Sequence, residues 1–393
     1  DDDEASAEDA GGSYSSFSQP ARTFFSGEFH TQGQVDLGFA NNGEDVVEWW
    51  NFARMKLDHA SSSSRAIVEA WVRWGVVAEN TKRGSSFYLV NARNGKWASD
   101  IQLREGYLSW KMGDFSLKLG QRIFVWGQNE YQPPSDVLNP TDLRYGLLAS
   151  LGSTRDGKVP VFAVDGSYWL GDTGFQLVIL PFFQKNRSFV YGRDFALAAP
   201  GSDQEEQLAI LGSAHPSTQD KIQDSFWGTQ IPEESLAGAS AAFRLKSTIW
   251  SWDLAFTSYY GWDRTPKIKL DSDLKEFLLA SEGIGSDPTL AILNPALRSK
   301  ILILQQKGAV GEELFKVSYR RMMRFAFEAQ GVVGPFVLRM DLGFSPKQLY
   351  YTQALNSIAL PTASGVLGLE YTYGETWYLS LTGFGSALLE PPS

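Results

Sequence analysis

The sequence predicts an all-β fold, a transmembrane antiparallel up-and-down β-barrel of about 14–16 strands with long structured loops and short helices. Three observations predict this fold. Apolar and polar residues alternate along thirteen segments with a period of two, which is the strand pattern. Short and long connections alternate between these segments. Aromatic residues are frequent, at 25 Phe, 15 Tyr and 13 Trp, and many lie near segment ends, where interfacial girdles form.

The first alternating segment, 28–39, shows the pattern clearly. Glu28 and His30 point to one side, and Phe29 and Val35 point to the other. The twelve later segments are 48–58, 66–77, 103–112, 115–126, 162–171, 174–183, 238–250, 252–262, 315–330, 336–344, 366–373 and 376–384. Most of them reach the ~9–11 residues that a strand needs to cross a membrane.

The lengths of the connections favour a barrel over a soluble β-sandwich, which would also show one apolar and one polar face. The short set is 61–64, 113–114, 171–174, the region around 251, 331–335 and 374–375. The other set is 40–45, which is short, and the long connections 78–101, 127–161, 185–236, 263–314 and 352–364. Short turns at one rim and long loops at the other are typical of outer-membrane barrels.

The expected organisation is an acidic disordered tail, 1–22, followed by a single barrel domain, 23–393. Four of the long loops, 78–101, 127–161, 185–236 and 263–314, belong to that domain. Bacterial barrels close with an even number of strands. Because thirteen is odd, either the pattern misses a strand or the given chain stops before the last strand or strands of the barrel, and we expect the latter.

Composition excludes several classes of function. The chain has no cysteine, so thiolate metal sites and cysteine nucleophiles are excluded, and its three histidines are too scattered to suggest a zinc site. The net charge of −10 argues against a nucleic-acid partner, which needs a basic surface. No apolar run approaches the ~18 residues of a membrane helix. No cofactor and no metal are expected.

Successive side chains of a strand point to opposite faces, and we call this alternation strand parity. Parity places many charged residues on the inner face of the predicted barrel. Burying so many unpaired ions would cost several kcal/mol each, so this face must hold water or a network of ion pairs. The candidate pore-lining residues are Arg54, Arg73, Arg122, Arg320, Arg324, Arg339, Glu105 and Asp341. They fit either an arginine-lined constriction that selects solutes or struts that brace the wall. By parity Arg321 faces lipid, which a β-bulge would explain.

The segment 126–146 interrupts the alternation with three prolines and several charges. Proline cannot donate to a strand ladder, so the segment is expected to be a stiff loop. We expect it to fold against the inner wall and narrow the pore, with Asp142 and Arg144 as its anchor. The candidate residues of this constriction loop are Trp126, Asp136, Asp142 and Arg144.

Two loop segments have helical periodicity, 272–283 and 294–308, and 203–212 is also helix-like. A serine or aspartate cap precedes the first, and Pro295 begins the second. These helices are expected to form lids over the mouth or a plug that folds inward. Whether their apolar faces pack on each other or contact an apolar ligand stays open.

A catalytic function receives little support. His30 is the only histidine on an inward strand position, and no G-x-S-x-G motif surrounds a serine in a strand-to-helix turn. The chain is therefore expected not to be an enzyme, with an outer-membrane lipid hydrolase kept as the second alternative.

The segment 103–144 resembles the porin-like outer-membrane barrels of the domain-of-unknown-function family 1302. The matching motifs are R-E-x-Y-L at 104–108, G-x-x-x-x-x-W-G at the strand end 120–127, and N-P-x-D-x-R at 139–144. The segment 177–187 is also similar, whereas Gly106 stands where the family pattern has alanine. The resemblance implies a barrel. It also implies a channel, in a family sometimes linked to the export or uptake of hydrophobic molecules.

The expected function is an outer-membrane channel that passes or binds small solutes through a charged lumen narrowed by loops. Its expected partners are the lipid of the bacterial outer membrane and a small-molecule solute. The first alternative is a plugged barrel that serves as a receptor, a scaffold or a subunit of an envelope complex with a protein partner.

Overall fold

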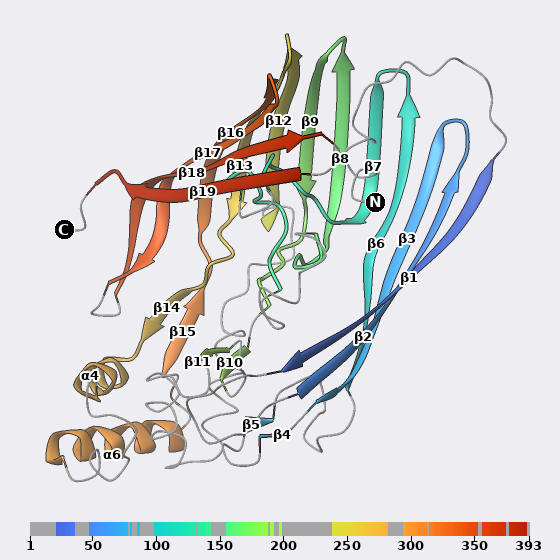
Figure 1. Cartoon of the computed structure of the whole chain (residues 1–393). Coiled ribbons are helices and arrows are strands. Elements are labelled where there is room, and N and C mark those ends of the chain that lie inside the picture. Colours follow the sequence, from blue (N-terminus) through green and yellow to red (C-terminus); the bar gives the residue numbers. More distant parts are fainter. Residues whose placement is uncertain are drawn as a thin grey trace.

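The computed structural model describes residues 21–35, 47–77, 79–80, 85–86, 98–129, 133–142, 155–187, 189–191, 196–198, 238–281, 294–310, 312, 314–352, 356–374 and 377–390. Within them, thirteen antiparallel strands form one sheet in which each strand pairs with the next along the chain (Figure 1). The first seven strands of the sheet are β1 (Arg22–Val35), β2 (Val47–Ala60), β3 (Ser64–Val77), β6 (Ala98–Met112), β7 (Phe115–Arg122), β8 (Val161–Leu170) and β9 (Thr173–Leu180). The other six are β12 (Ser240–Ile249), β13 (Trp252–Trp262), β16 (Arg321–Val333), β17 (Phe336–Tyr351), β18 (Ser357–Tyr373) and β19 (Trp377–Leu388).

This architecture confirms the prediction of an all-β, up-and-down antiparallel sheet. The sheet is curved but not closed, since β1 and β19 are its two edges. Three two-stranded ladders lie outside it. They are β4 (Glu79–Asn80) with β5 (Ser85–Ser86), β10 (Phe189–Tyr191) with β11 (Ala196–Ala198), and β14 (Lys267–Leu270) with β15 (Phe315–Ser318).

Most strand boundaries differ from the sequence prediction, and three of the differences change the topology or the connections. β7 ends at Arg122 rather than at 126, because the Phe124 N–H donates to the side chain of Asn139 instead of a neighbouring strand. The predicted strand 315–330 is two strands, β15 and β16, separated by Tyr319 and Arg320. β18 begins at Ser357, so the connection before it is only 352–356. The acidic tail is expected in 1–22, of which 1–20 lie outside the described residues.

The break before β16 also explains Arg321, which parity places among lipid-facing residues. Arg321 is the first residue of β16 rather than a mid-strand residue. Its guanidinium donates to the Ala239 carbonyl at 2.6 Å and lies 4.3 Å from the centre of the Trp262 ring. The charge therefore stands at the rim, against an aromatic ring, and no bulge is required.

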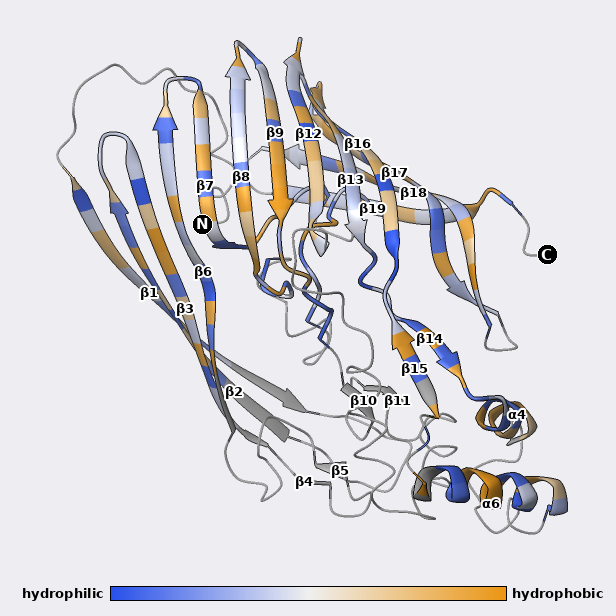
Figure 2. Cartoon of the chain, turned by 180° about the vertical axis from the view of Figure 1, so that it is seen from behind, coloured by the Kyte–Doolittle hydropathy of each residue, from blue (hydrophilic) through white to orange (hydrophobic). Residues whose placement is uncertain are grey.

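The sheet buries charged residues and exposes apolar ones. On β16, Phe327 is 37% exposed and the adjacent Glu328 is 0% exposed. On β17, Leu342 is 43% exposed and the adjacent Asp341 is 0% exposed. Figure 2 shows polar and apolar bands that alternate along the strands. The convex face is therefore apolar and the concave face carries the charges, the reverse of a soluble sheet.

Two helices follow β14 and precede β15, as the sequence predicts: α4 (Ser272–Ser281) and α6 (Pro295–Ala309). Asp271 caps α4 by accepting from the Asp273 N–H, and Asn294 caps α6 by accepting from the Ala296 N–H. Their apolar faces pack on each other. The buried cluster between them is Leu274, Phe277, Leu297, Ile301 and Leu304. None of the helices in the described part of the chain is long and apolar enough to cross a membrane.

Candidate functional site

The segment after β7 turns into the concave side of the sheet. We call residues 123–129, 133–142 and 155–160 the inner segment. Asn139 holds its two halves together: its Oδ1 accepts from the Phe124 N–H at 2.7 Å, and its Nδ2 donates to the Val159 carbonyl at 2.8 Å. These contacts satisfy backbone groups that β7 would otherwise have paired in the sheet.

Apolar side chains seat the inner segment on the middle of the wall. Phe124, Trp126, Val137 and Leu138 are all buried. They form a single cluster with wall residues of β8, β9, β12 and β13. Those wall residues are Val161, Ala163, Val178, Leu180, Ala242 and Tyr259. The wall side chains here are mostly small, which leaves room for the two aromatic rings of the segment.

Hydrogen bonds to Asp341 fasten the segment to β17. The carboxylate accepts from the Asn129 N–H at 2.9 Å, from the Asn129 Nδ2 at 2.5 Å and from the Gln128 N–H at 3.1 Å. Nearby, Arg339 donates to the Gln128 carbonyl at 3.2 Å and pairs with Glu370 of β18. β8, β9, β12, β13 and β16 lie between β7 and β17 in the sheet. The segment therefore crosses the concave face from one wall toward another.

Two glycines allow this close approach. A Cβ on Gly343 of β17 would lie 2.3 Å from the Cβ of Pro134, and a Cβ on Gly368 of β18 would lie 2.5 Å from Oδ1 of Asn129. Both contacts are far below van der Waals distance, so any larger residue would push the segment off the wall.

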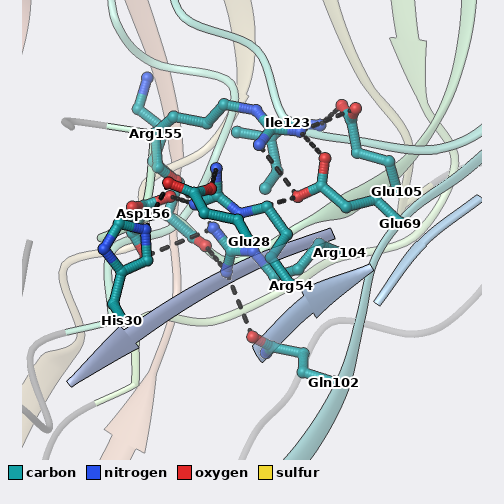
Figure 3. Close-up of polar contacts among 11 residues, drawn as sticks. Glu28, His30, Arg54, Glu69, Gln102, Arg104, Glu105, Ile123, Arg155 and Asp156 are labelled. Carbon is teal, nitrogen blue, oxygen red and sulfur yellow. Dashed lines mark hydrogen bonds and ion pairs between the residues drawn. The ribbon is translucent and has the colours of Figure 1, made fainter. Parts of the chain in front are cut away.

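Ion pairs fasten the other end of the segment to β2, β3 and β6 (Figure 3). Arg155 contacts Glu69 at 2.9 Å and Glu105 at 2.8 Å. Asp156 contacts Arg54 at 2.7 Å. Multiple charge-assisted contacts of this kind fix a loop more firmly than single surface ion pairs do.

A β-bulge brings Arg104 into this cluster. The register between β3 and β6 shifts between Glu69 and Ala70, so that Arg104 and Glu105 both turn inward. Arg104 is 1% exposed and donates to the carbonyls of Lys158 at 2.7 Å and of Arg155 at 2.8 Å. Its guanidinium also lies 4.1 Å from the centre of the Trp71 ring.

The middle of the segment has a buried ion pair of its own. Lys158 contacts Asp136 at 2.5 Å and donates to the Phe124 carbonyl at 2.7 Å. Burial raises the pKa of Asp136 and lowers the pKa of Lys158, while the attraction between the two groups opposes both shifts. Arg264 donates to the carbonyls of Val137 and Leu138. The segment is thus braced by its own charges and by the wall.

The structure brings most of the predicted site residues to this concave face. Arg54 and Glu105 contact the inner segment directly, Asp341 accepts from it, and Arg339 donates to it. Trp126 is buried in it. Arg122 pairs with Asp165 on the wall, and Arg73 lies 5.5 Å from the Trp71 ring centre.

The remaining predicted residues lie nearer the long-loop rim. Arg320 pairs with Asp263 at 3.0 Å, and Arg324 donates to Gln348 at 3.3 Å. Asp142 lies 3.9 Å from Arg187, and Arg144 is outside the described residues. In the described part of the chain, the segment is fastened through Asp136, Asn129 and Asn139, together with Arg155 and Asp156.

Sequence reasoning missed Arg104, Arg155 and Lys158 as site residues. Parity places Arg104 outward, and only the bulge reverses it. The sequence carried a signal for the bulge, since Arg104 and Glu105 are adjacent charges inside an alternating strand. Nothing local marked Arg155 or Lys158, because their partners lie far away in the sequence.

No family model matches the chain, and no curated protein matches it. The resemblance to family 1302 therefore stays a hypothesis. Among solved structures, the chain is similar to Salmonella typhi OmpF in a complex with daunomycin, at 8% identity and a TM-score of 0.41, covering 93% of this chain and 78% of that one. It is similar to Acinetobacter baumannii OccAB3, at 8% identity and a TM-score of 0.40, covering 94% and 67%.

A third similar structure is the outer membrane channel DcaP of Acinetobacter baumannii, at 10% identity and a TM-score of 0.38, covering 93% of this chain and 79% of that one. Similarity at this level carries no argument about activity. The strand pairing, the burial and the contacts of this chain carry the functional conclusion instead.

Proposed function

We propose that this chain is an integral outer-membrane channel for small polar solutes, and that its inner segment forms the constriction. The observation that carries the proposal is the reversed burial of the sheet. Large apolar side chains are exposed on most of its strands, whereas soluble monomers rarely expose contiguous apolar patches larger than a few hundred Å². A lipid environment removes that cost, and the charged concave face then becomes the water-filled side.

One of the described lumen arginines supports a passage that selects solutes by charge. Arg54, Arg122, Arg320 and Arg339 each pair with a carboxylate. Arg324 differs from them, because its hydrogen bond goes to the neutral amide of Gln348. We propose that Arg324 is the guanidinium that acts on passing anions.

The test is conductance of the pure protein in a planar bilayer. We expect an open-channel current whose anion preference falls in Arg324→Gln and survives in Arg324→Lys. We take the charge to lie about 8 Å from the solute path, at an effective dielectric constant about half that of water. Removing it then changes the interaction energy with a passing anion by about 1 kcal/mol, which changes the permeability ratio by about fivefold. Unchanged selectivity in Arg324→Gln would remove the role given to this residue.

The plugged barrel remains a second candidate because the inner segment is fastened at both ends and through its middle. An absence of current from correctly folded protein would reject the channel and favour this alternative. A lipid hydrolase has no comparable support. Among the described residues, the side chain of His30 contacts the carboxylate of Glu28 and no serine hydroxyl.

A further inference from the structure

The two-stranded ladder of β14 and β15 lies beyond the ends of β13 and β16, on the long-loop side (Figure 1). We call this ladder the hairpin, although α4 and α6 lie between its two strands in the chain. Its register pairs Lys269 directly with Lys316 and Lys267 with Ser318. Since side chains alternate across a strand, all three lysines share one face of the hairpin. We call Lys267, Lys269 and Lys316 the lysine face.

The other face of the hairpin is apolar and packed. Ile268 and Leu270 pack against the buried cluster of α4 and α6, and Val317 is 1% exposed. This packing fixes the orientation of the hairpin, so the three lysines cannot turn away from solvent. Lys267, Lys269 and Lys316 are exposed.

Among the described residues, no carboxylate contacts the lysine face. No hydrogen bond and no ion pair involves these three side chains in the part of the chain that the structure describes. The neighbouring helices differ. There Lys300 and Lys307 both contact Asp273, and their hydrogen bonds lower the pKa of that carboxyl. Two like charges directly opposite each other destabilise a ladder. The pair Lys269 and Lys316 is nevertheless present in a chain whose net charge is −10.

We propose that the lysine face binds the phosphate groups of a phosphorylated glycolipid, lipopolysaccharide, at the membrane surface. Two ammonium groups on opposite strands can both donate to one phosphate, which would relieve their repulsion. The hairpin also follows closely on an aromatic strand end, a position typical of a membrane interface. Lys267 follows the last residue of β13, Trp262, by five positions, which is at most ~17 Å of extended chain. Arg321 stacks on Trp262 and Tyr260 at this same rim.

This inference rests on the proposed outer-membrane location and adds a lipid ligand to it. The binding test uses the full chain, folded in a nonionic detergent, so it does not depend on channel activity. Binding of lipopolysaccharide is compared with binding of the same glycolipid after enzymatic removal of its phosphates, and inorganic pyrophosphate serves as the soluble phosphate probe.

The variants Lys269→Glu and Lys316→Glu separate lipid binding from a structural role. Each creates a favourable Glu–Lys pair across the hairpin, so the thermal midpoint stays equal or rises. We expect each to weaken lipopolysaccharide binding at least tenfold, whereas Lys111→Glu, at an exposed lysine on the opposite rim, leaves it unchanged. Dephosphorylated glycolipid should bind at least tenfold more weakly than the intact one.

Three results would overturn the proposal. They are equal binding of the dephosphorylated glycolipid, undiminished binding in both hairpin variants, and pyrophosphate binding as tight as lipopolysaccharide binding with the same dependence on Lys269. The bilayer current of Lys269→Glu distinguishes failure of the lipid-binding proposal from failure of the channel proposal. A normal current with unchanged lipid binding overturns the lipid site alone.

Discussion

Replacing Arg244 by methionine is expected to lower the free energy of unfolding by about 3–5 kcal/mol, the cost of leaving a buried charge unpaired. Arg244 on β12 contacts Glu328 on β16 at 2.5 Å, and the two residues are 5% and 0% exposed. The pair spans β13, where the register places Thr257 and Ala255 opposite them. These small residues let the guanidinium reach across. Urea unfolding in detergent, followed by tryptophan fluorescence, measures the effect.

The matched control is the double variant Arg244→Met with Glu328→Met. It removes both charges and fills their volume, so we expect it to recover most of the lost stability. Equal destabilisation in the single and double variants would contradict the ion pair as the source of the effect. It would point instead to packing of the Arg244 stem against Trp126, whose ring centre lies 5.1 Å from the guanidinium carbon.

The second large effect is expected from Gly343→Val. The new side chain would collide with Pro134, because even a Cβ would lie 2.3 Å from the Cβ of that residue. Overpacking of this kind costs about 1–3 kcal/mol, which the molecule can escape by releasing the segment from β17. We expect the single-channel conductance to rise roughly twofold as the constriction widens.

Gly385→Val is the matched control for this result. A Cβ at Gly385 of β19 meets nothing within 4 Å, so the same substitution there should leave conductance unchanged. A lower conductance in Gly343→Val, or a rise of equal size in both variants, would contradict the placement of Pro134 against the wall.

Local sequence signals predicted the sheet well because each strand carries its own alternation. Pairing between successive strands needs only short-range information, and the Asp271 and Asn294 caps of α4 and α6 are equally local. The predictions failed where a distant partner sets the geometry. Asn139 ends β7 early by binding the Phe124 N–H, and the bulge at Arg104 reverses the facing that parity assigns.

The candidate site shows the same division. Parity identified Arg54, Glu105 and Asp341 as inward residues, since strand position alone decides that. It could not show what they bind. Their partners Asn129, Arg155 and Asp156 all belong to the connection between β7 and β8, which has no periodicity. Its proline content predicted only that it is stiff.

The central claim is that the inner segment lies across the concave face of the sheet and not over its rim. The chain has no cysteine, so a pair of introduced cysteines reports on this placement directly. A Cβ on Gly368 would lie 3.6 Å from Cγ of Asn129, which is close to disulfide range. Asn129→Cys with Gly368→Cys should therefore form an intramolecular disulfide in intact outer membranes. Asn129→Cys with Gly383→Cys should form none. Two free thiols in the first pair after oxidation, with Cys at 129 reactive to an impermeant maleimide from outside, would contradict this placement.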